Sequence, residues 1–258
     1  MRRAAFDRVG SLWVPGQRRR AWLPIDVPGY SFWFSAKAGV TDSGSGTASA
    51  LADVRARGTR YTTSQATSGK RPTIATGINS RASLTFASAS SQELTNTTDN
   101  PIASGVTRYV LIVAKAATDS VGGGGTLFAF RLNTTGGRQW SCQCIRGGDN
   151  NTYYFTDAVS NNVVEPTAGA PSIASPFIIE YELTLGATPV VRINGTARTL
   201  SGSINATGEL GTTGFKIGSG GGFWNGEIGD VFCATGIPSS ADKSRLRNFF
   251  SVTNGGII

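Results

Sequence analysis

Hydrophobic and polar residues alternate along much of the chain with the two-residue period of β-strands. The clearest case is 177–185, where the odd-numbered residues from Phe177 to Leu185 are all apolar and the even-numbered ones include Glu180 and Glu182. Because successive side chains of a strand point to opposite faces, this pattern predicts a strand with one face in the core. We expect the other face, with its two glutamates, to lie on the solvent side.

Further strands follow from short apolar runs between turn residues. Tyr109 to Ala114 is continuously apolar and β-branched, which predicts a strand covered on both faces. Asn194-Gly195 is a strong hairpin signal. Ser239 or Ser240 can cap a short helix that contains Leu246, Phe249 and Phe250. Other strands are expected at 31–34, 83–86, 126–132, 190–193, 196–200, 215–217 and 226–234. This pattern predicts an all-β, two-sheet sandwich with one short C-terminal helix.

The first thirty residues have a different pattern. Two apolar islands, around Trp13 and Trp22, are each followed by proline, which favours extended or turn geometry. We therefore divide the chain into an extended N-terminal arm, 1–30, and a sandwich domain, 31–258.

Charge separates these two parts as well. The formal net charge is +8, and residues 1–20 supply +5 of it through six arginines against Asp7. A basic arm can bind nucleic acid or an acidic protein surface, and tryptophan and arginine are the residue types that dominate protein interfaces. The residues expected to bind a partner are Arg2, Arg3, Arg8, Trp13, Arg18, Arg19, Arg20 and Trp22.

Composition narrows the class of protein further. The 34 glycines and the 16% of charged residues are typical of short strands joined by turns. The longest purely apolar run, Val110 to Ala114, is far shorter than the ~20 residues of a membrane helix, and no signal peptide is expected after Arg3. Cys142, Cys144 and Cys233 are an odd set, which predicts free buried thiols. The chain has no histidine, and we expect neither a metal site nor a cofactor.

Several segments, in order, resemble the concanavalin A-like lectin/glucanase superfamily, in the laminin G-like form common in phage and bacterial proteins. The C-terminal block carries most of the similarity: Lys216-Ile217-Gly218-Ser219, then Phe223-Trp224-Asn225-Gly226-Glu227-Ile228-Gly229-Asp230-Val231, then Ile237-Pro238-Ser239-Ser240. Trp33-Phe34-Ser35-Ala36, Arg71-Pro72-Thr73 and the segment from Val191 to Gly195 add to it. The resemblance implies an antiparallel jelly-roll sandwich, a fold that hosts lectins, hydrolases and structural modules.

Catalysis is not expected. Glucanases of this superfamily use two carboxylates on one face of a strand as nucleophile and acid. Glu180 and Glu182 share a face but lack a third acid at the family's spacing. Glu227 and Asp230 are three residues apart, so a regular strand would place them on opposite faces. Without histidine, a Ser-His-Asp triad is also excluded.

A sugar site is the main alternative chemistry. Aromatic side chains beside polar loops form platforms for sugars, and the candidates are Trp140, Arg146, Asp149, Asn151, Tyr153, Tyr154 and Trp224. The nearly neutral body lacks the basic, aromatic surface that binds single-stranded nucleic acid.

The leading interpretation is a non-enzymatic phage virion structural protein. It would decorate the head or belong to the tail or fibre, dock through its basic arm onto other virion proteins as part of a homo-oligomeric assembly, and be assembled in the host cytoplasm. The alternative is a carbohydrate-binding module or lectin, including one that binds a host receptor.

Overall fold

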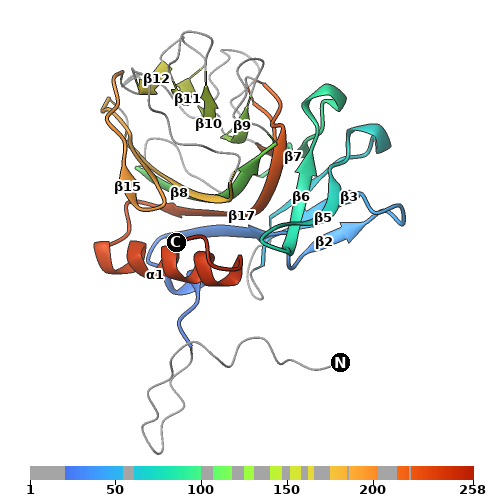
Figure 1. The fold of residues 1–258 in the computed structure, drawn as a ribbon, viewed down its shortest axis with the longest axis horizontal. Coiled ribbons are helices and arrows are strands. Elements are labelled where there is room, and N and C mark those ends of the chain that lie inside the picture. Colours follow the sequence, from blue (N-terminus) through green and yellow to red (C-terminus); the bar gives the residue numbers. More distant parts are fainter. Residues whose placement is uncertain are drawn as a thin grey trace, which may run out of the picture.

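The described part of the chain forms two antiparallel β-sheets that pack face to face, with one α-helix on the outside (Figure 1). This confirms the predicted jelly-roll sandwich. The computed structural model describes residues 21–54, 61–99, 107–117, 125–130, 140–146, 152–157, 162–165, 175–184, 186–202, 214–220 and 222–258. The side chains of 145–146, 152–153, 156–157 and 162–165 lie outside this description.

One sheet, sheet A, has eight strands among the described residues. Its order is β15 (Thr196–Ala197), β14 (Val190–Ile193), β13 (Phe177–Leu183), β8 (Arg108–Ala116), β17 (Gly226–Thr235), β6 (Arg81–Phe86) and β5 (Thr73–Ile78), and β1 (Tyr30–Ser35) also pairs with β17. The long strand β17 therefore pairs with β8 along one side and with β6 and β1 in succession along the other.

The other sheet, sheet B, has nine strands among the described residues. Its order is β12 (Asn162–Glu165), β11 (Thr152–Asp157), β10 (Trp140–Arg146), β9 (Thr126–Phe130), β16 (Phe215–Ile217), β7 (Leu94–Asn96), β4 (Thr62–Ser64), β3 (Ala48–Ala52) and β2 (Val40–Asp42). Three short 3-10 helices, η1 (Pro24–Asp26), η2 (Ser68–Lys70) and η3 (Ser88–Ser90), and the helix α1 (Ser240–Thr253) complete the described elements.

The main core lies between the sheets and is built on aromatic rings. Phe32 of β1 stacks on Phe215 of β16 with ring centroids 5.6 Å apart, and Phe128 of β9 packs against both. The odd-numbered residues of β13 from Phe177 to Leu183 belong to this core, as their alternation predicts. Leu185 lies outside the described residues.

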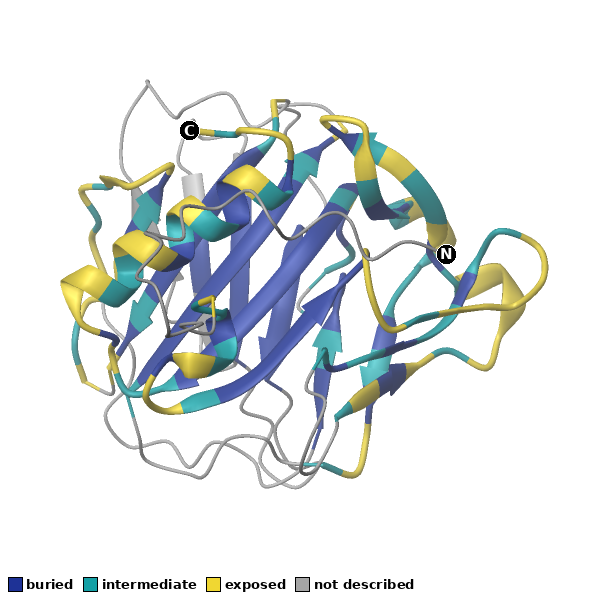
Figure 2. Cartoon of the chain, turned by 90° about the horizontal axis from the view of Figure 1, so that it is seen from below, coloured by how far each residue is buried: buried dark blue, intermediate teal, exposed yellow. Residues whose placement is uncertain are grey.

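A second core lies on the outer face of sheet A. Tyr109, Leu111 and Val113 of β8 pack there with Leu246 and Phe250 of α1. Figure 2 shows α1 crossing the buried strands of sheet A, on the side away from sheet B. Strand β8 is therefore covered on both faces, which confirms the prediction from its continuous apolar sequence.

The same helix corrects the prediction for the glutamate face of β13. Glu180 is fully buried there, rather than on the solvent side, because α1 lies over it and supplies compensating charge. Arg247 of α1 donates to both carboxylate oxygens of Glu180, at 3.0 and 3.2 Å, and the Tyr109 hydroxyl donates to Glu180 at 2.6 Å.

Residues 21–30, the last part of the predicted arm, pack against the second core of the sandwich. Val27 is only 3% exposed, and Trp22 packs edge-on against Phe249 of α1 with ring centroids 6.4 Å apart. The prolines here shape the turn of η1, and the apolar side chains around it anchor the segment to the second core.

The three cysteines are free and buried, as predicted. Burial raises the pKa of Cys142 well above its usual value and, despite the nearby charge of Arg108, raises that of Cys233 to about 12. The thiol of an unfolded chain has a pKa of about 8.5. Above that pH the folded protein still holds protons that the unfolded chain has released, so the free energy of unfolding falls as the pH rises toward the folded pKa.

We therefore expect the melting temperature to fall steadily as the pH rises from about 8.5 toward 12. Alkylation at neutral pH should leave the native protein unmodified and label all three thiols after denaturation. Thiols that react in the native protein, or a mass that shows one labelled thiol after denaturation, would contradict their burial as free groups.

Candidate functional site

The structure corrects the predicted aromatic sugar platform. Trp140, Tyr154 and Trp224 are 2%, 0% and 2% exposed and belong to the core between the sheets, so their rings offer no face to a sugar. The reason is strand parity, since Trp140 points inward together with Cys142 and Cys144. The side chains of Arg146 and Tyr153, and all of Asp149 and Asn151, lie outside the described residues.

The outer face of sheet B carries a row of small and polar side chains. Successive cross-strand pairs place one row of residues across seven strands of this face: Ser141, Ala129, Lys216, Thr95, Ser64, Ala50 and Thr41. Their sequence neighbours Cys142, Phe128, Phe215, Leu94 and Leu51 point into the core. We call this set the Lys216 row. All of its side chains are small except Lys216, and four of them carry hydroxyl groups.

A polar cluster surrounds the lysine. Lys216 Nζ lies 2.9 Å from Glu93 Oε2, and the hydroxyl of Ser219 donates to the same oxygen. Burial alone would raise the pKa of Glu93, but the hydrogen bonds from Ser219 and Lys216, together with the charge of Lys216, hold it below its ordinary value. Glu93 is therefore ionised at neutral pH. The Oγ1 atom of Thr95 is buried and has no hydrogen-bond partner in the described part of the chain.

This arrangement supplies both kinds of hydrogen-bonding group that a sugar needs. The carboxylate accepts, the ammonium donates, and the exposed hydroxyls of Ser64 and Thr41 do either. Glu93 is paired with a lysine rather than with a second carboxylate, whereas glycosidases need two carboxyl groups about 5–9.5 Å apart.

The Glu180 and Glu182 pair is likewise not arranged for hydrolysis. Glu182 is bound by Arg192 of β14 and by Lys243 of α1, whose Nζ lies 2.8 Å from Glu182 Oε1. Both carboxylates are thus held in ion pairs beneath or beside the helix. They fix α1 on the sheet.

Glu227 and Asp230 share a face of β17, contrary to the prediction. A register shift between Ile228 and Asp230 inserts an extra residue, so Glu227 lies opposite Lys115 and Asp230 opposite Val113 on the outer face of sheet A. Gly229 occupies the bulge, where an added Cβ would lie 2.9 Å from the Asn254 side chain.

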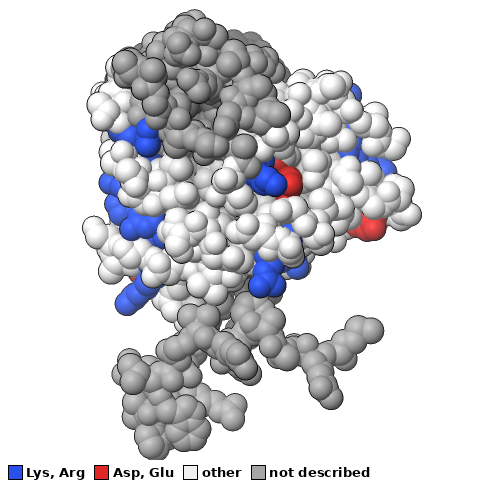
Figure 3. Space-filling view, viewed as in Figure 1, with Lys and Arg blue, Asp and Glu red and all other residues white. Residues whose placement is uncertain are grey.

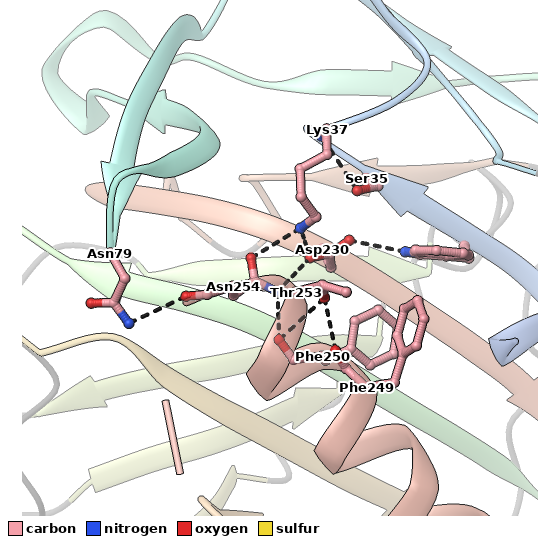
Figure 4. A network of polar contacts seen from close by, with 9 residues as sticks. Ser35, Lys37, Asn79, Asp230, Phe249, Phe250, Thr253 and Asn254 are labelled. Carbon is pink, nitrogen blue, oxygen red and sulfur yellow. Dashed lines mark hydrogen bonds and ion pairs between the residues drawn. The ribbon is translucent and has the colours of Figure 1, made fainter. Parts of the chain in front are cut away.

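Asp230 anchors the far end of α1. Its carboxylate accepts from Trp33 Nε1 at 2.9 Å and Asn254 Nδ2 at 2.8 Å, and pairs with Lys37 (Figure 4). Asn79 Nδ2 reaches the backbone oxygen of Asn254 at 3.2 Å. Asp230 and Asn254 are buried at the centre of this network, whereas Lys37 and Asn79 lie at its edge. The network joins β1, β17 and the end of the helix.

Most of the predicted arm residues, Arg2, Arg3, Arg8, Trp13, Arg18, Arg19 and Arg20, lie outside the described residues. Trp22 is described and contacts α1 of its own domain. Across the described ranges, no cluster of three or more potential metal ligands is found. None of the described helices is both long and apolar enough to cross a membrane.

Comparison with solved structures identifies the fold. The binding domain of Paraclostridial Mosquitocidal Protein 1 superposes over 86% of this chain with a TM-score of 0.53 and 12% identity. An arabinofuranosidase complexed with arabinofuranosyl-alpha-1,2-xylobiose superposes over 81% with a TM-score of 0.55 and 12% identity. The matched parts are 52% and 51% of those chains, so this protein spans about half their length.

These similarities show the fold and not the activity. The protein has the concanavalin A-like sandwich fold, as the sequence motifs imply. No protein-family model matches the chain, and no curated protein is similar to it in sequence.

Proposed function

We propose that this chain is a non-catalytic carbohydrate-binding domain that holds a glycan on the outer face of sheet B. The observation that carries this proposal is the Lys216 row with its Glu93 and Ser219 cluster. The row crosses seven strands in continuous register, but Ala129 and Ser141 are buried. The part that a sugar can approach runs over five strands, from Lys216 to Thr41, where the other side chains are small. The similarity to a binding domain and to a sugar-bound arabinofuranosidase supports the same class of function.

Each group in the row has a defined part in this proposal. The Lys216 ammonium and the Ser219 hydroxyl hold the Glu93 carboxylate in place, so its orientation exists before a ligand arrives. Ordered groups of this kind lose little conformational entropy on binding. The hydroxyls of Ser64 and Thr41 are exposed and open to a sugar, whereas the Thr95 Oγ1 atom is buried beneath this surface.

The test is a glycan array followed by calorimetry with the best ligand. Ser64→Arg places a bulky side chain at an exposed position of the row and should weaken binding about tenfold or more. Arg245→Met, at an exposed position of α1 on the outside of sheet A, serves as the control and should bind as the wild type does.

Two outcomes would contradict the proposal. One is the absence of any bound glycan. The other is hydrolysis of the bound glycan that disappears in Glu93→Gln, because a non-catalytic domain has no general acid or nucleophile to lose.

The charge distribution favours a second candidate function, a virion structural protein of the head, tail or fibre that attaches through its arm. Residues 1–20 hold +5 of the net +8, and Trp22 ties the end of this segment to α1. Mass spectrometry of purified particles from the source would test it. Stoichiometric recovery of this chain supports that role, and its absence from particles excludes it.

A further inference from the structure

Basic side chains gather at the Lys216 end of the exposed row. Lys70 of η2 lies next to Glu93, because the Glu93 N–H donates to the backbone oxygen of Lys70 at 3.1 Å. Burial alone would raise the pKa of Glu93, and the charge of Lys70 is among the contributions that lower it. Lys216 binds the same carboxylate, and Arg71 directly follows Lys70. We call Lys70, Arg71, Glu93 and Lys216 the basic cluster.

Arg71 is held in this cluster by backbone oxygens rather than by a carboxylate. Its Nε donates to the oxygen of Gln65 and its Nη2 to that of Ala66, both at 2.8 Å. Gln65 directly follows β4, and its side-chain Nε2 donates to the backbone oxygen of Glu93 at 3.4 Å. The guanidinium is therefore fixed beside the ends of β4 and β7, and its Nη1 group has no hydrogen bond to the described residues.

Positive charge exceeds negative charge in the basic cluster. Three cationic side chains share one carboxylate, which leaves two positive charges uncompensated within the cluster. Lys70 is exposed, and the side chain of Lys216 is 23% exposed. The Lys216 ammonium has three N–H groups, of which its bond to Glu93 uses one. On the side of the molecule drawn in Figure 3, described lysine and arginine side chains likewise cover more of the surface than acidic ones.

We infer that the glycan held by the Lys216 row is an acidic one, whose carboxylate or sulfate groups lie against the basic cluster; this inference rests on the proposed function. Ammonium and guanidinium groups form their strongest hydrogen bonds with anionic oxygens. The exposed hydroxyls of Ser64 and Thr41 then bind the neutral hydroxyls of the same glycan. A neutral glycan would use these hydroxyls equally well but would gain nothing from the charges of Lys70 and Arg71.

A duplex nucleic acid also presents anionic oxygens, but it fits this surface less well. Double-stranded DNA carries one negative charge per about 1.7 Å of its axis, so it needs cations along the whole contact. The basic cluster occupies one end of the row, and the row continues from there through the neutral residues Ser64, Ala50 and Thr41. This arrangement matches a chain in which acidic groups and neutral hydroxyls occur together.

Two pairs of polysaccharides test the inference, each pair with one backbone in a charged and a neutral form. Polygalacturonate is compared with its methyl ester, and dextran sulfate with dextran, by calorimetry with the full chain. The charged member of at least one pair should bind about tenfold or more tightly than its neutral counterpart, and that pair identifies the anionic group. Raising the salt from about 0.1 to 1 M should remove most of this difference, since the Debye length falls from ~10 to ~3 Å.

Lys70 gives the sharpest variant, because it adds charge without belonging to the Lys216 row. Lys70→Gln should weaken binding of the charged polysaccharide about fivefold and leave binding of the neutral one unchanged, and Lys70→Arg should bind both as the wild type does. Arg245→Gln removes the same charge from an exposed position of α1, on the outside of sheet A, and should change neither affinity. This control separates a local contact from the net positive charge of the whole chain.

Three results would overturn the inference: neutral members that bind as tightly as the charged ones in both pairs, equal losses in Lys70→Gln and Arg245→Gln, or duplex DNA that binds more tightly than either charged polysaccharide. In the first case a neutral glycan still binds, so the proposed function stands while the inference fails. If neither the polysaccharides nor any glycan of the array binds, the proposed function fails together with it.

Discussion

Replacing Arg247 by methionine is expected to lower the free energy of unfolding by about 3–5 kcal/mol, because it leaves a buried carboxylate without its cation. Glu180 is fully buried beneath α1, and Arg247 is its basic partner on that helix. Tyr109 still donates one hydrogen bond to Glu180 in the variant, but a neutral hydroxyl does not compensate the charge. Chemical denaturation at neutral pH measures the loss.

Two companion variants show whether charge is the cause. Glu180→Gln combined with Arg247→Met should recover a large part of the stability, since the uncompensated charge is then gone. Arg245→Met, on the same helix but exposed, should cost less than about 1 kcal/mol. A loss below about 1 kcal/mol in Arg247→Met would mean that the ion pair does not hold α1 on the sheet.

Replacing Asp230 by alanine is expected to cost about 3 kcal/mol or more, because three donors lose their common acceptor. Trp33 Nε1, Asn254 Nδ2 and Lys37 Nζ all contact this buried carboxylate. The end of α1 should loosen first, so hydrogen exchange should quicken at residues 250–254 before it does so in β8.

Lys37→Met is the control for this network. Lys37 is 24% exposed, so its removal leaves Asp230 with two hydrogen bonds and some access to water, and the loss should be smaller than for Asp230→Ala. An Asp230→Ala variant with wild-type stability would contradict the role assigned to the network.

The strands were predictable from the sequence where periodicity alone decides the outcome. The alternation in β13 and the continuous apolar run of β8 both identified which faces are buried. Periodicity does not say what covers a face, so the glutamates of β13 were assigned to solvent. The burial of Glu180 depends on α1, which begins 60 residues later in the chain, and only the tertiary arrangement brings Arg247 to this glutamate.

The candidate site was harder to predict. The aromatic residues Trp140, Tyr154 and Trp224 were selected by type, although Trp140 has the same parity as the buried cysteines of its strand. Lys216 between Phe215 and Ile217 did carry a signal, since a lysine flanked by two core residues must point outward. Glu93 and Thr95 carried none, because the three-residue strand β7 is too short to show a period.

The bulge in β17 explains why the predicted placement of Glu227 and Asp230 on opposite faces is wrong. In a regular strand, Glu227 and Asp230 would point to opposite faces of the sheet. The inserted residue turns both side chains to the same face. Gly229 was the available signal, because glycine inside a strand often marks a bulge. Without the register of the neighbouring strand, that signal does not tell which residues change sides.

The central claim is that a glycan binds the outer face of sheet B, and backbone NMR titration with the best array ligand tests it most directly. The account predicts that the largest amide shifts fall on β16, β7 and β4, around Lys216, Thr95 and Ser64, and that α1 stays unperturbed. Shifts confined to α1, or saturation of the ligand without shifts on sheet B, would contradict it.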